Sequence, residues 1–174
     1  GMPGFDSTAV KGYHYEPEKA AALLAEAGFP NGKGMPQVTL STSTTYKDLI
    51  EFIQGELAAI GIKVKVDVSP NASLRDLMSK NEVNFFRGSW IADYPDGENY
   101  LAMFYSKNKV PNGPNYTAYY NNDFDKLFEQ SYYVSDNAKR YLLYQKMDQM
   151  VIDYANIVPI YYDQSVIMTQ NNIS

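Results

Sequence analysis

Residues 87–96 bring together the side chains of this sequence that are best suited to chemistry. Arg87 supplies a cation, Trp90 an indole, and Asp93 and Asp96 supply two carboxylates. The residues before this segment are apolar and aromatic, so we expect the four side chains at the end of a strand and in the following loop. Ligands of open α/β sheets bind at such strand ends. The segment is therefore our first candidate for a binding cleft.

Each of these side chains also has a structural interpretation. Arg87 could form an internal salt bridge, because a buried cation needs a carboxylate partner or access to a cleft. Asp93 could form the turn before Pro95, and Trp90 could belong to the core. Asp93 and Asp96 could act as the carboxylate pair of a glycoside hydrolase, but nothing in the sequence sets their separation. Together, the cation, the indole and the carboxylate favour a cleft more than each does alone.

The composition argues against several other kinds of site. The 174 residues contain no cysteine, which excludes a thiolate nucleophile, a disulfide framework and Cys-based zinc sites. The one histidine, His14, argues against a multi-histidine metal site, and we expect it in a loop. Residues 31–34 lack the spacing of a phosphate-binding P-loop. We expect no cofactor, and the net charge of -5 argues against nucleic acid as a partner.

Tyrosine is the unusual residue of the composition, with 16 copies in a chain whose length suits one globular domain. Its rigid ring and polar end suit clefts and interfaces, although core packing is the expected role of most copies. Four of them could equally well border a cleft or pack within strands: Tyr119, Tyr120, Tyr161 and Tyr162. No stretch approaches the roughly 20 apolar residues that span a bilayer.

Helix and strand patterns alternate along the chain and predict an α/β fold. Helical spacing is found over 17–27, 46–60, 74–78, 99–105, from 124 onward and, after a cap at 135–136, over the apolar positions 143–154. Strand patterns are found over 38–42, 62–68, 83–90, 157–162 and 166–168, with 83–90 expected to be a central strand. The strand–helix–strand order of residues 37–68 predicts a parallel pair. Residues 106–121 are expected to form a long surface loop.

Local signals place the ends of several helices. Pro17 suits the first position of the first helix, and Gly28 suits its stop. Thr45 and Asp48 resemble a capping box for the second helix. Ser135 and Asp136 are expected to cap the last one.

Four motifs in this order resemble the C-terminal lobe of extracytoplasmic solute-binding proteins of the dipeptide/oligopeptide class, which serve ABC transporters. Residues 16–29 resemble the family's opening "pro-glu-lys-ala … leu-leu-ala-glu-ala-gly". Residues 53–66 resemble "leu-x-x-ile-gly-ile-x-val", and 90–96 resemble "trp-x-ala-asp-tyr-pro-asp". Residues 120–125 resemble "tyr-x-asn … phe-asp". The resemblance covers residues 3–170, nearly the whole chain.

The resemblance implies a lobe of the type II periplasmic-binding-protein fold, with a mixed sheet flanked by helices. We expect an irregular segment at 1–14, in which Gly1 is a tag-cleavage scar, one lobe at 15–170, and a truncated end at 171–174. The expected partners are a peptide ligand, the N-terminal lobe of the same parent protein and an ABC transporter permease. The expected location is the periplasmic space, with or without a lipid anchor, and no catalysis is expected.

The resemblance also assigns roles to single residues. In peptide binders of the family, the aspartate that matches Asp93 binds the α-ammonium group of the peptide. The arginine that matches Arg87 binds the peptide's C-terminal carboxylate in some members. The backbone around Ser89 and Ile91 resembles the stretch that pairs with the peptide main chain. The expected ligand-binding set is completed by Trp90 and Tyr94.

Other functions remain open from the sequence alone. A protein of the same fold could bind a glycan, a nickel complex or heme, and the lobe could also be a docking module for another protein. One departure from the family pattern is Gly97, which stands where many members have proline. This glycine is expected to loosen the loop that carries Asp93 and Asp96.

Overall fold

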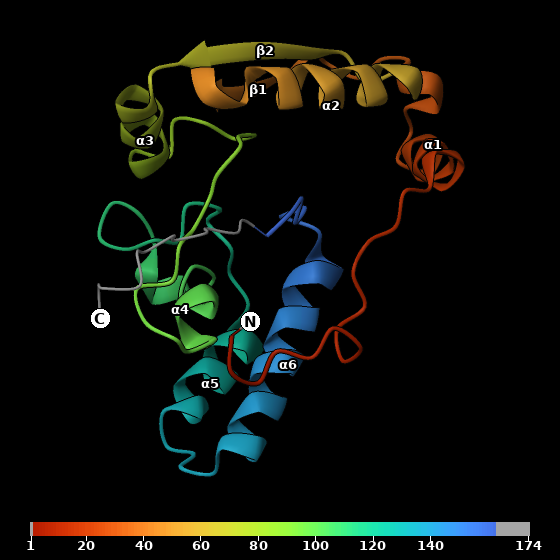
Figure 1. Ribbon diagram of the computed structural model, residues 1–174. Coiled ribbons are helices and arrows are strands. Elements are labelled where there is room, and N and C mark those ends of the chain that lie inside the picture. Colours follow the sequence, from red (N-terminus) through yellow and green to blue (C-terminus); the bar gives the residue numbers. More distant parts are fainter. Residues whose placement is uncertain (1, 163–174) are drawn as a thin grey trace, which may run out of the picture.

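The computed structural model describes residues 2–162, which form two groups of elements joined by extended chain (Figure 1). The first group, called the sheet unit, contains β1 (Val38–Ser43), α2 (Lys47–Ala59), β2 (Val64–Ser69) and α3 (Asn71–Ser79). The second, called the helical unit, contains α4 (Glu98–Leu101), α5 (Asn122–Ser131) and α6 (Asn137–Tyr154). Helix α1 (Pro17–Glu26) precedes the sheet unit. The α/β class predicted from the sequence is confirmed.

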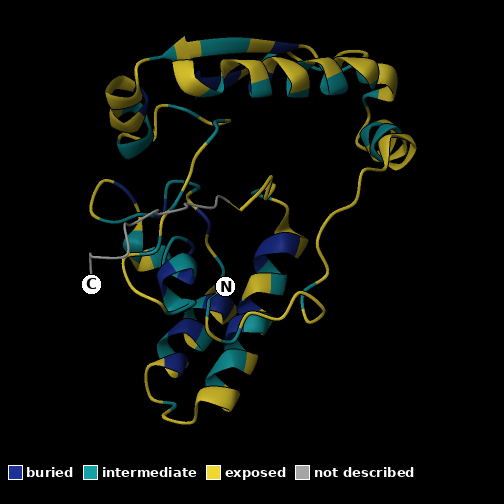
Figure 2. Cartoon of the chain, viewed as in Figure 1, coloured by how far each residue is buried: buried dark blue, intermediate teal, exposed yellow. Residues whose placement is uncertain are grey.

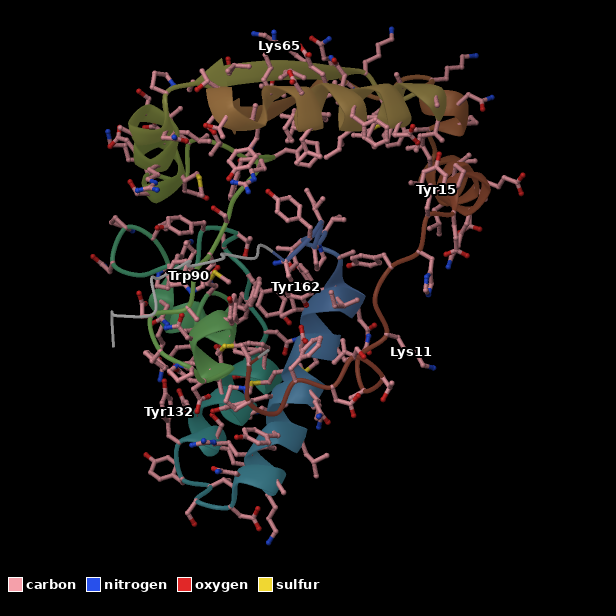
Figure 3. The ribbon with its side chains drawn as sticks, viewed as in Figure 1. Lys11, Tyr15, Lys65, Trp90, Tyr132 and Tyr162 are labelled. Atoms are coloured by element: carbon pink, nitrogen blue, oxygen red, sulfur yellow. The ribbon has the colours of Figure 1, made fainter. Side chains whose placement is uncertain are left out.

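The sheet unit is built on the predicted strand–helix–strand arrangement. Strands β1 and β2 are parallel, with a register that runs from Val38 opposite Val64 to Ser43 opposite Ser69. Helix α2 lies along the pair (Figure 1), and Leu40, Ile50 and Val64 form the buried core between them. Alternation along β2 leaves Lys65 on the face turned away from α2 (Figure 3).

Residues 83–90 do not form the predicted central strand. They pair with β1 through a single parallel bridge, between Ser41 and Phe86. The Ser41 N–H donates to the Phe85 carbonyl at 2.9 Å, and the Arg87 N–H donates to the Ser41 carbonyl at 2.9 Å. Within residues 2–162 no strand lies on the other side of this segment, so the pairing has support from one side only. Beyond the bridge the chain turns away from the sheet toward α4 (Figure 1).

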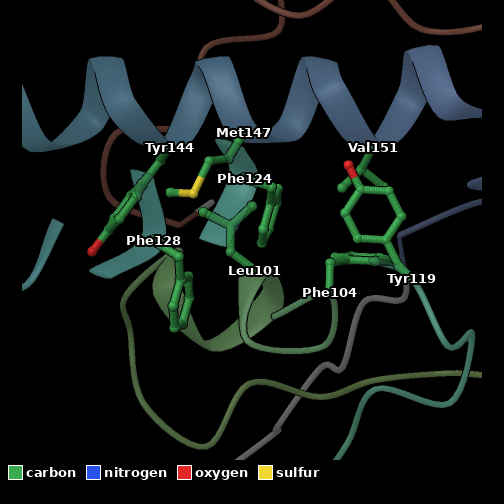
Figure 4. Close-up of a cluster of buried hydrophobic side chains, with 8 residues drawn as sticks. All are labelled: Leu101, Phe104, Tyr119, Phe124, Phe128, Tyr144, Met147 and Val151. Atoms are coloured by element: carbon green, nitrogen blue, oxygen red, sulfur yellow. The ribbon is translucent and has the colours of Figure 1, made fainter. Parts of the chain in front are cut away.

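The helical unit encloses the larger core. Its buried side chains come from α4, α5, α6 and the chain between α4 and α5: Leu101, Phe104, Tyr119, Phe124, Phe128, Tyr144, Met147 and Val151 (Figure 4). Many of these rings meet edge to face, as Phe104 and Tyr119 do at 6.0 Å between ring centroids. Such contacts add directional stabilisation to the burial of apolar area.

The predicted surface loop at 106–121 is partly buried, contrary to that prediction. It contains a 3-10 turn at Ser106–Asn108 and the buried side chains of Val110, Asn115 and Tyr119. The Asn115 amide donates to the Tyr119 carbonyl at 2.9 Å and accepts from the Tyr119 N–H at 3.1 Å. These bonds satisfy the buried backbone and allow an irregular segment to enter the core.

Most predicted helix ends are confirmed. Pro17 begins α1, and Gly28 follows its end with φ of +92°. The Asp136 side chain caps α6 by accepting from the Lys139 N–H at 3.2 Å. The predicted capping box of Thr45 and Asp48 is wrong. Residues Thr44–Tyr46 form a 3-10 turn that runs directly into α2, and no side chain caps that helix.

The N-terminal segment of the described chain lies against α6. The Lys11 N–H donates to the Gln149 side chain at 2.8 Å, and the Tyr13 hydroxyl donates to the Ile152 carbonyl at 2.5 Å. Residues 157–162 form no strand, contrary to prediction, and most of them are exposed (Figure 2). The strand predicted at 166–168 lies outside the described residues.

Candidate functional site

Asn99, at the centre of the short helix α4, organises the loop that carries Trp90 and Asp93. Its side chain is 5% exposed. The Trp90 Nε1–H donates to Asn99 Oδ1 at 2.7 Å, and the Asp93 backbone N–H donates to the same oxygen at 3.3 Å. The Asn99 Nδ2–H donates to Asp93 Oδ2 at 3.4 Å. Trp90 accordingly lies beside α4 (Figure 3), and one buried amide holds both members of the motif.

The Asp93 carboxylate has no cationic partner among the described residues. Asp93 is exposed, and it forms no ion pair with any residue in the described range 2–162. Its side chain accepts a hydrogen bond from the neutral amide of Asn99. A carboxylate that is oriented by a neutral donor remains free to accept charge-assisted hydrogen bonds from a cationic group.

Asp96 has a different surrounding from Asp93. Its Oδ2 pairs with Arg140 Nη2 at 3.1 Å, and its Oδ1 accepts from the Glu98 N–H at 3.0 Å. The pKa of the Tyr144 hydroxyl is raised, mainly by burial and next by its interaction with the Asp96 carboxylate. Asp96 thus joins the start of α4 to α6, which favours a structural role over that of a partner for Asp93 in acid–base chemistry.

Gly97 does not give the loop an unusual backbone. Its φ of -61° and ψ of -22° lie in the right-handed helical region, and proline adopts the same φ. A Cβ atom at this position would lie 3.3 Å from the Tyr144 ring. The conformation is therefore one that the family's proline would also favour.

Arg87 is half-buried and stacked on an aromatic ring. Its Cζ lies 3.3 Å from the centroid of the Tyr46 ring, and its Nη2 lies 3.4 Å from the Tyr161 hydroxyl. None of the ion pairs in the described part of the chain involves Arg87, so the internal salt bridge considered from the sequence is not seen there. The cation is instead stabilised by the π face of Tyr46.

The other predicted site residues are dispersed. Ser89 is exposed, and Ile91 is 87% exposed. The Tyr94 hydroxyl donates to Glu98, which also accepts from the Tyr132 hydroxyl at 2.8 Å. Tyr94 is therefore held on the surface of the helical unit, in contact with residues that were not predicted to belong to the site.

The structure thus groups the predicted residues into two parts. Arg87 belongs to the edge of the sheet unit, whereas Trp90 and Asp93 belong to the helical unit. Sequence reasoning missed Asn99 and Tyr46. The position of Asn99, two residues before the core residue Leu101, could have indicated a buried amide that forms hydrogen bonds with the neighbouring loop. Tyr46 carried no such signal, because it fitted the apolar face of a helix equally well.

Two cavities of the described chain lie away from these residues. One, of about 610 Å³, lies where α2 meets the start of β2, with Gln54, Ile62 and Lys63 in its wall. The other, of about 290 Å³, lies between the N-terminal segment and α6, with Tyr13 and Asp148 in its wall. Within residues 2–162 no three acidic or histidine side chains gather as a metal site, and no helix has the length and apolarity needed to cross a bilayer.

Sequence comparison connects the chain with transport proteins. Residues 1–112 match the model of "Bacterial extracellular solute-binding proteins, family 5 Middle". Heme-binding protein A of Haemophilus influenzae is 28% identical over 155 residues, which are 87% of this chain and 28% of that protein. The glutathione-binding protein GsiB of Escherichia coli K12 is 27% identical over 172 residues, which are 95% of this chain and 34% of that protein. The chain thus spans about a third of the length of these relatives.

Solved structures agree with this connection. The periplasmic binding protein DppA of Helicobacter pylori, in complex with the peptide STSA, superposes with a TM-score of 0.82 and 31% identity over 91% of this chain and 31% of that one. OppA of Haemophilus influenzae, in complex with a nonapeptide, superposes with a TM-score of 0.77 and 22% identity over 88% of this chain and 31% of that one, which shows the fold alone. The fold is the type II periplasmic-binding-protein fold. The chain belongs to the family 5 bacterial extracellular solute-binding proteins.

Proposed function

We propose that this chain is the ligand-contacting lobe of a solute-binding protein that delivers peptides to an ABC importer. The observation that supports this best is the Asp93 carboxylate, which Asn99 orients and which forms no ion pair within residues 2–162. Such a group suits the α-ammonium of a peptide, because a charge-assisted hydrogen bond is stronger than a neutral one. The structure of Helicobacter pylori DppA with a tetrapeptide supports the same class of ligand.

The remaining candidates would contact other parts of the peptide. Arg87 carries a planar fork of donors that suits the C-terminal carboxylate. The exposed backbone at Ser89 and Ile91 offers main-chain groups that can pair with any peptide, whatever its side chains. In this proposal the lobe spans residues 15–170, a second lobe of the complete protein closes over the ligand in the periplasm, and the closed form docks on a permease.

A second class of cargo is favoured by the relatives themselves. One is named for heme and another for glutathione. Glutathione carries an α-ammonium group as peptides do, so it would use Asp93 in the same way. Heme carries carboxylates but no ammonium group, so it would engage Arg87 without Asp93. Whether affinity depends on Asp93 therefore distinguishes ligands with an α-ammonium group from ligands such as heme that lack one.

The test is Asp93→Ala in the complete protein, with binding measured by calorimetry. We expect affinity for a peptide with a free N-terminus to fall at least about tenfold, the size expected for a lost hydrogen bond to a charged group. An N-acetylated version of the peptide should bind wild type weakly and should be insensitive to the substitution. Asp123→Ala, at an exposed carboxylate of α5, is the matched control and should leave affinity unchanged. Equal affinity of wild type and Asp93→Ala would refute the assignment.

A further inference from the structure

The contact between Arg87 and Tyr46 joins two segments that leave the sheet in the same direction. Arg87 follows Phe86, whose bridge to Ser41 of β1 is parallel. Tyr46 ends the 3-10 turn Thr44–Tyr46 that follows β1. Because the carboxyl ends of parallel segments lie at the same edge of a sheet, the two side chains meet there. The contact between Tyr46 and Arg87 is thus a consequence of the parallel pairing of their two segments.

The backbone on both sides of this contact is fixed. Arg87 donates its own N–H to the Ser41 carbonyl at 2.9 Å. Tyr46 stands between β1 and the first residue of α2, and it is partly buried. A backbone hydrogen bond to β1 fixes Arg87 and a 3-10 turn fixes Tyr46, so the ring and the guanidinium group are held against each other.

Stacking determines which part of the guanidinium group remains available. Face-on contact at 3.3 Å between Cζ and the ring centroid occupies one face of the planar group. The N–H donors point outward in the plane of the group, so the ring does not compete for them. Among described residues, one side chain reaches this edge, the Tyr161 hydroxyl at the long distance of 3.4 Å from Nη2.

Among residues 2–162, no carboxylate neutralises the charge of the Arg87 guanidinium group. Arg87 is half-buried, and no carboxylate in residues 2–162 forms an ion pair with it. An aromatic face attracts a cation but leaves its positive charge in place. A stacked and oriented guanidinium group with no ion-pair partner among the described residues suits an incoming carboxylate, which binds its edge through two parallel hydrogen bonds.

We propose that Tyr46 is a positioning residue that holds the plane of Arg87, and that it thereby sets a preference for ligands that end in a free carboxylate. The inference rests on the proposed function, because it assigns the specificity of the same site. Tyr46 would act without touching the ligand. By ordering a long side chain before binding, it removes part of the entropy that the carboxylate contact would otherwise cost.

The experiment compares two ligands across wild type and two variants of the complete protein. The ligands are the tetrapeptide Ser-Thr-Ser-Ala as the free acid and as the C-terminal amide, and dissociation constants are measured by calorimetry. Tyr46→Leu removes the π face, whereas Tyr46→Phe keeps it. For Tyr46→Leu we expect roughly three- to tenfold weaker binding of the free acid, and less than about twofold change for the amide. Tyr46→Phe should match wild type for both ligands.

A double-mutant cycle with Arg87→Met shows whether Tyr46 acts through Arg87. In the Arg87→Met background, Tyr46→Leu should no longer change the ratio of the acid and amide affinities. A merely structural role for Tyr46 would weaken both ligands by the same factor, and that result would overturn the inference while leaving the proposed function intact. If wild type binds neither form of the tetrapeptide, the proposed function fails, and this inference fails with it.

Discussion

The buried side chain of Asn99 orients Trp90 and Asp93. It accepts from the Trp90 indole at 2.7 Å and donates to the Asp93 carboxylate at 3.4 Å. An amide can do both because it carries an acceptor and two donors on one planar group. The orientation of Asp93 is therefore set by a residue that a ligand does not need to touch.

Asn99→Ala should destabilise the chain by about 1–3 kcal/mol, because the Trp90 N–H loses its acceptor in a partly buried place. Trp90 is the single tryptophan, so its fluorescence reports on this bond directly. We expect a shifted emission maximum together with the lower stability in urea. Asn112→Ala, at an exposed asparagine, should change neither quantity. Unchanged emission in Asn99→Ala would show that the amide does not hold the indole.

The tyrosines show how one residue type serves several purposes. Tyr119 and Tyr144 are buried in the core of the helical unit. Others use their hydroxyl groups on surface carboxylates, as Tyr105 does with Glu129 at 2.6 Å. Burial and the hydrogen bond to Glu98 both raise the pKa of Tyr132 above the ordinary tyrosine value. Tyr46 stacks against Arg87.

Among the elements, α5 and α6 begin where short polar side chains can accept backbone bonds. The Asn121 side chain accepts from the N–H groups of Asp123 and Phe124, and Asp136 accepts from Lys139. Both caps satisfy donors that an α-helix leaves without partners in its first turn. They fix the starts of the two helices whose packing makes the larger core.

Asp136→Ala should lower the free energy of unfolding by about 0.5–2 kcal/mol, the usual effect of losing an N-cap. Ser135→Ala is the matched control, because Ser135 precedes the cap and accepts no bond from the first turn of α6. Urea denaturation of the two variants compares these positions. Equal destabilisation by both substitutions would contradict the assignment of Asp136 as the cap.

The segment 83–90 shows why strand predictions fail at sheet edges. Its apolar composition is that of a strand, yet it makes one bridge. A helix satisfies its backbone within itself, whereas a strand needs neighbours. Phe85 remains 40% exposed here, which is consistent with a missing neighbour.

At the scale of the whole molecule, the two units have separate cores. The cluster around Phe128 and the cluster around Ile50 share no residue. The main packing contacts between helices and strands also run within each unit. Chain segments join the units, including residues 80–97, which carry every predicted site residue (Figure 1).

Phe128→Ala should therefore destabilise the helical unit selectively, by the roughly 3–5 kcal/mol typical of a buried phenylalanine. Hydrogen exchange followed by NMR would measure it residue by residue. We expect amides of α5 and α6 to lose protection while those of β1 and β2 keep theirs. Ile50→Ala should give the reciprocal pattern. A uniform loss of protection across both units would show that they unfold as one cooperative body.

Much of this protein could be predicted from the sequence because the signals are local. Periodicity and the residues at helix ends located α1, α2, α5 and α6. The parallel pairing of β1 and β2 followed from the length of the crossover between them. The order of four motifs indicated the solute-binding family, which the match over residues 1–112 confirms.

Tertiary structure alone decided the contacts that link distant positions. It paired Asp96 with Arg140, placed Asn99 beneath Trp90 and stacked Arg87 on Tyr46. It also ended the segment 83–90 after one bridge and buried part of 106–121. Periodicity reports which face of an element is apolar, but it does not report which side chain from elsewhere will meet that face. Those partners are chosen only when the elements pack.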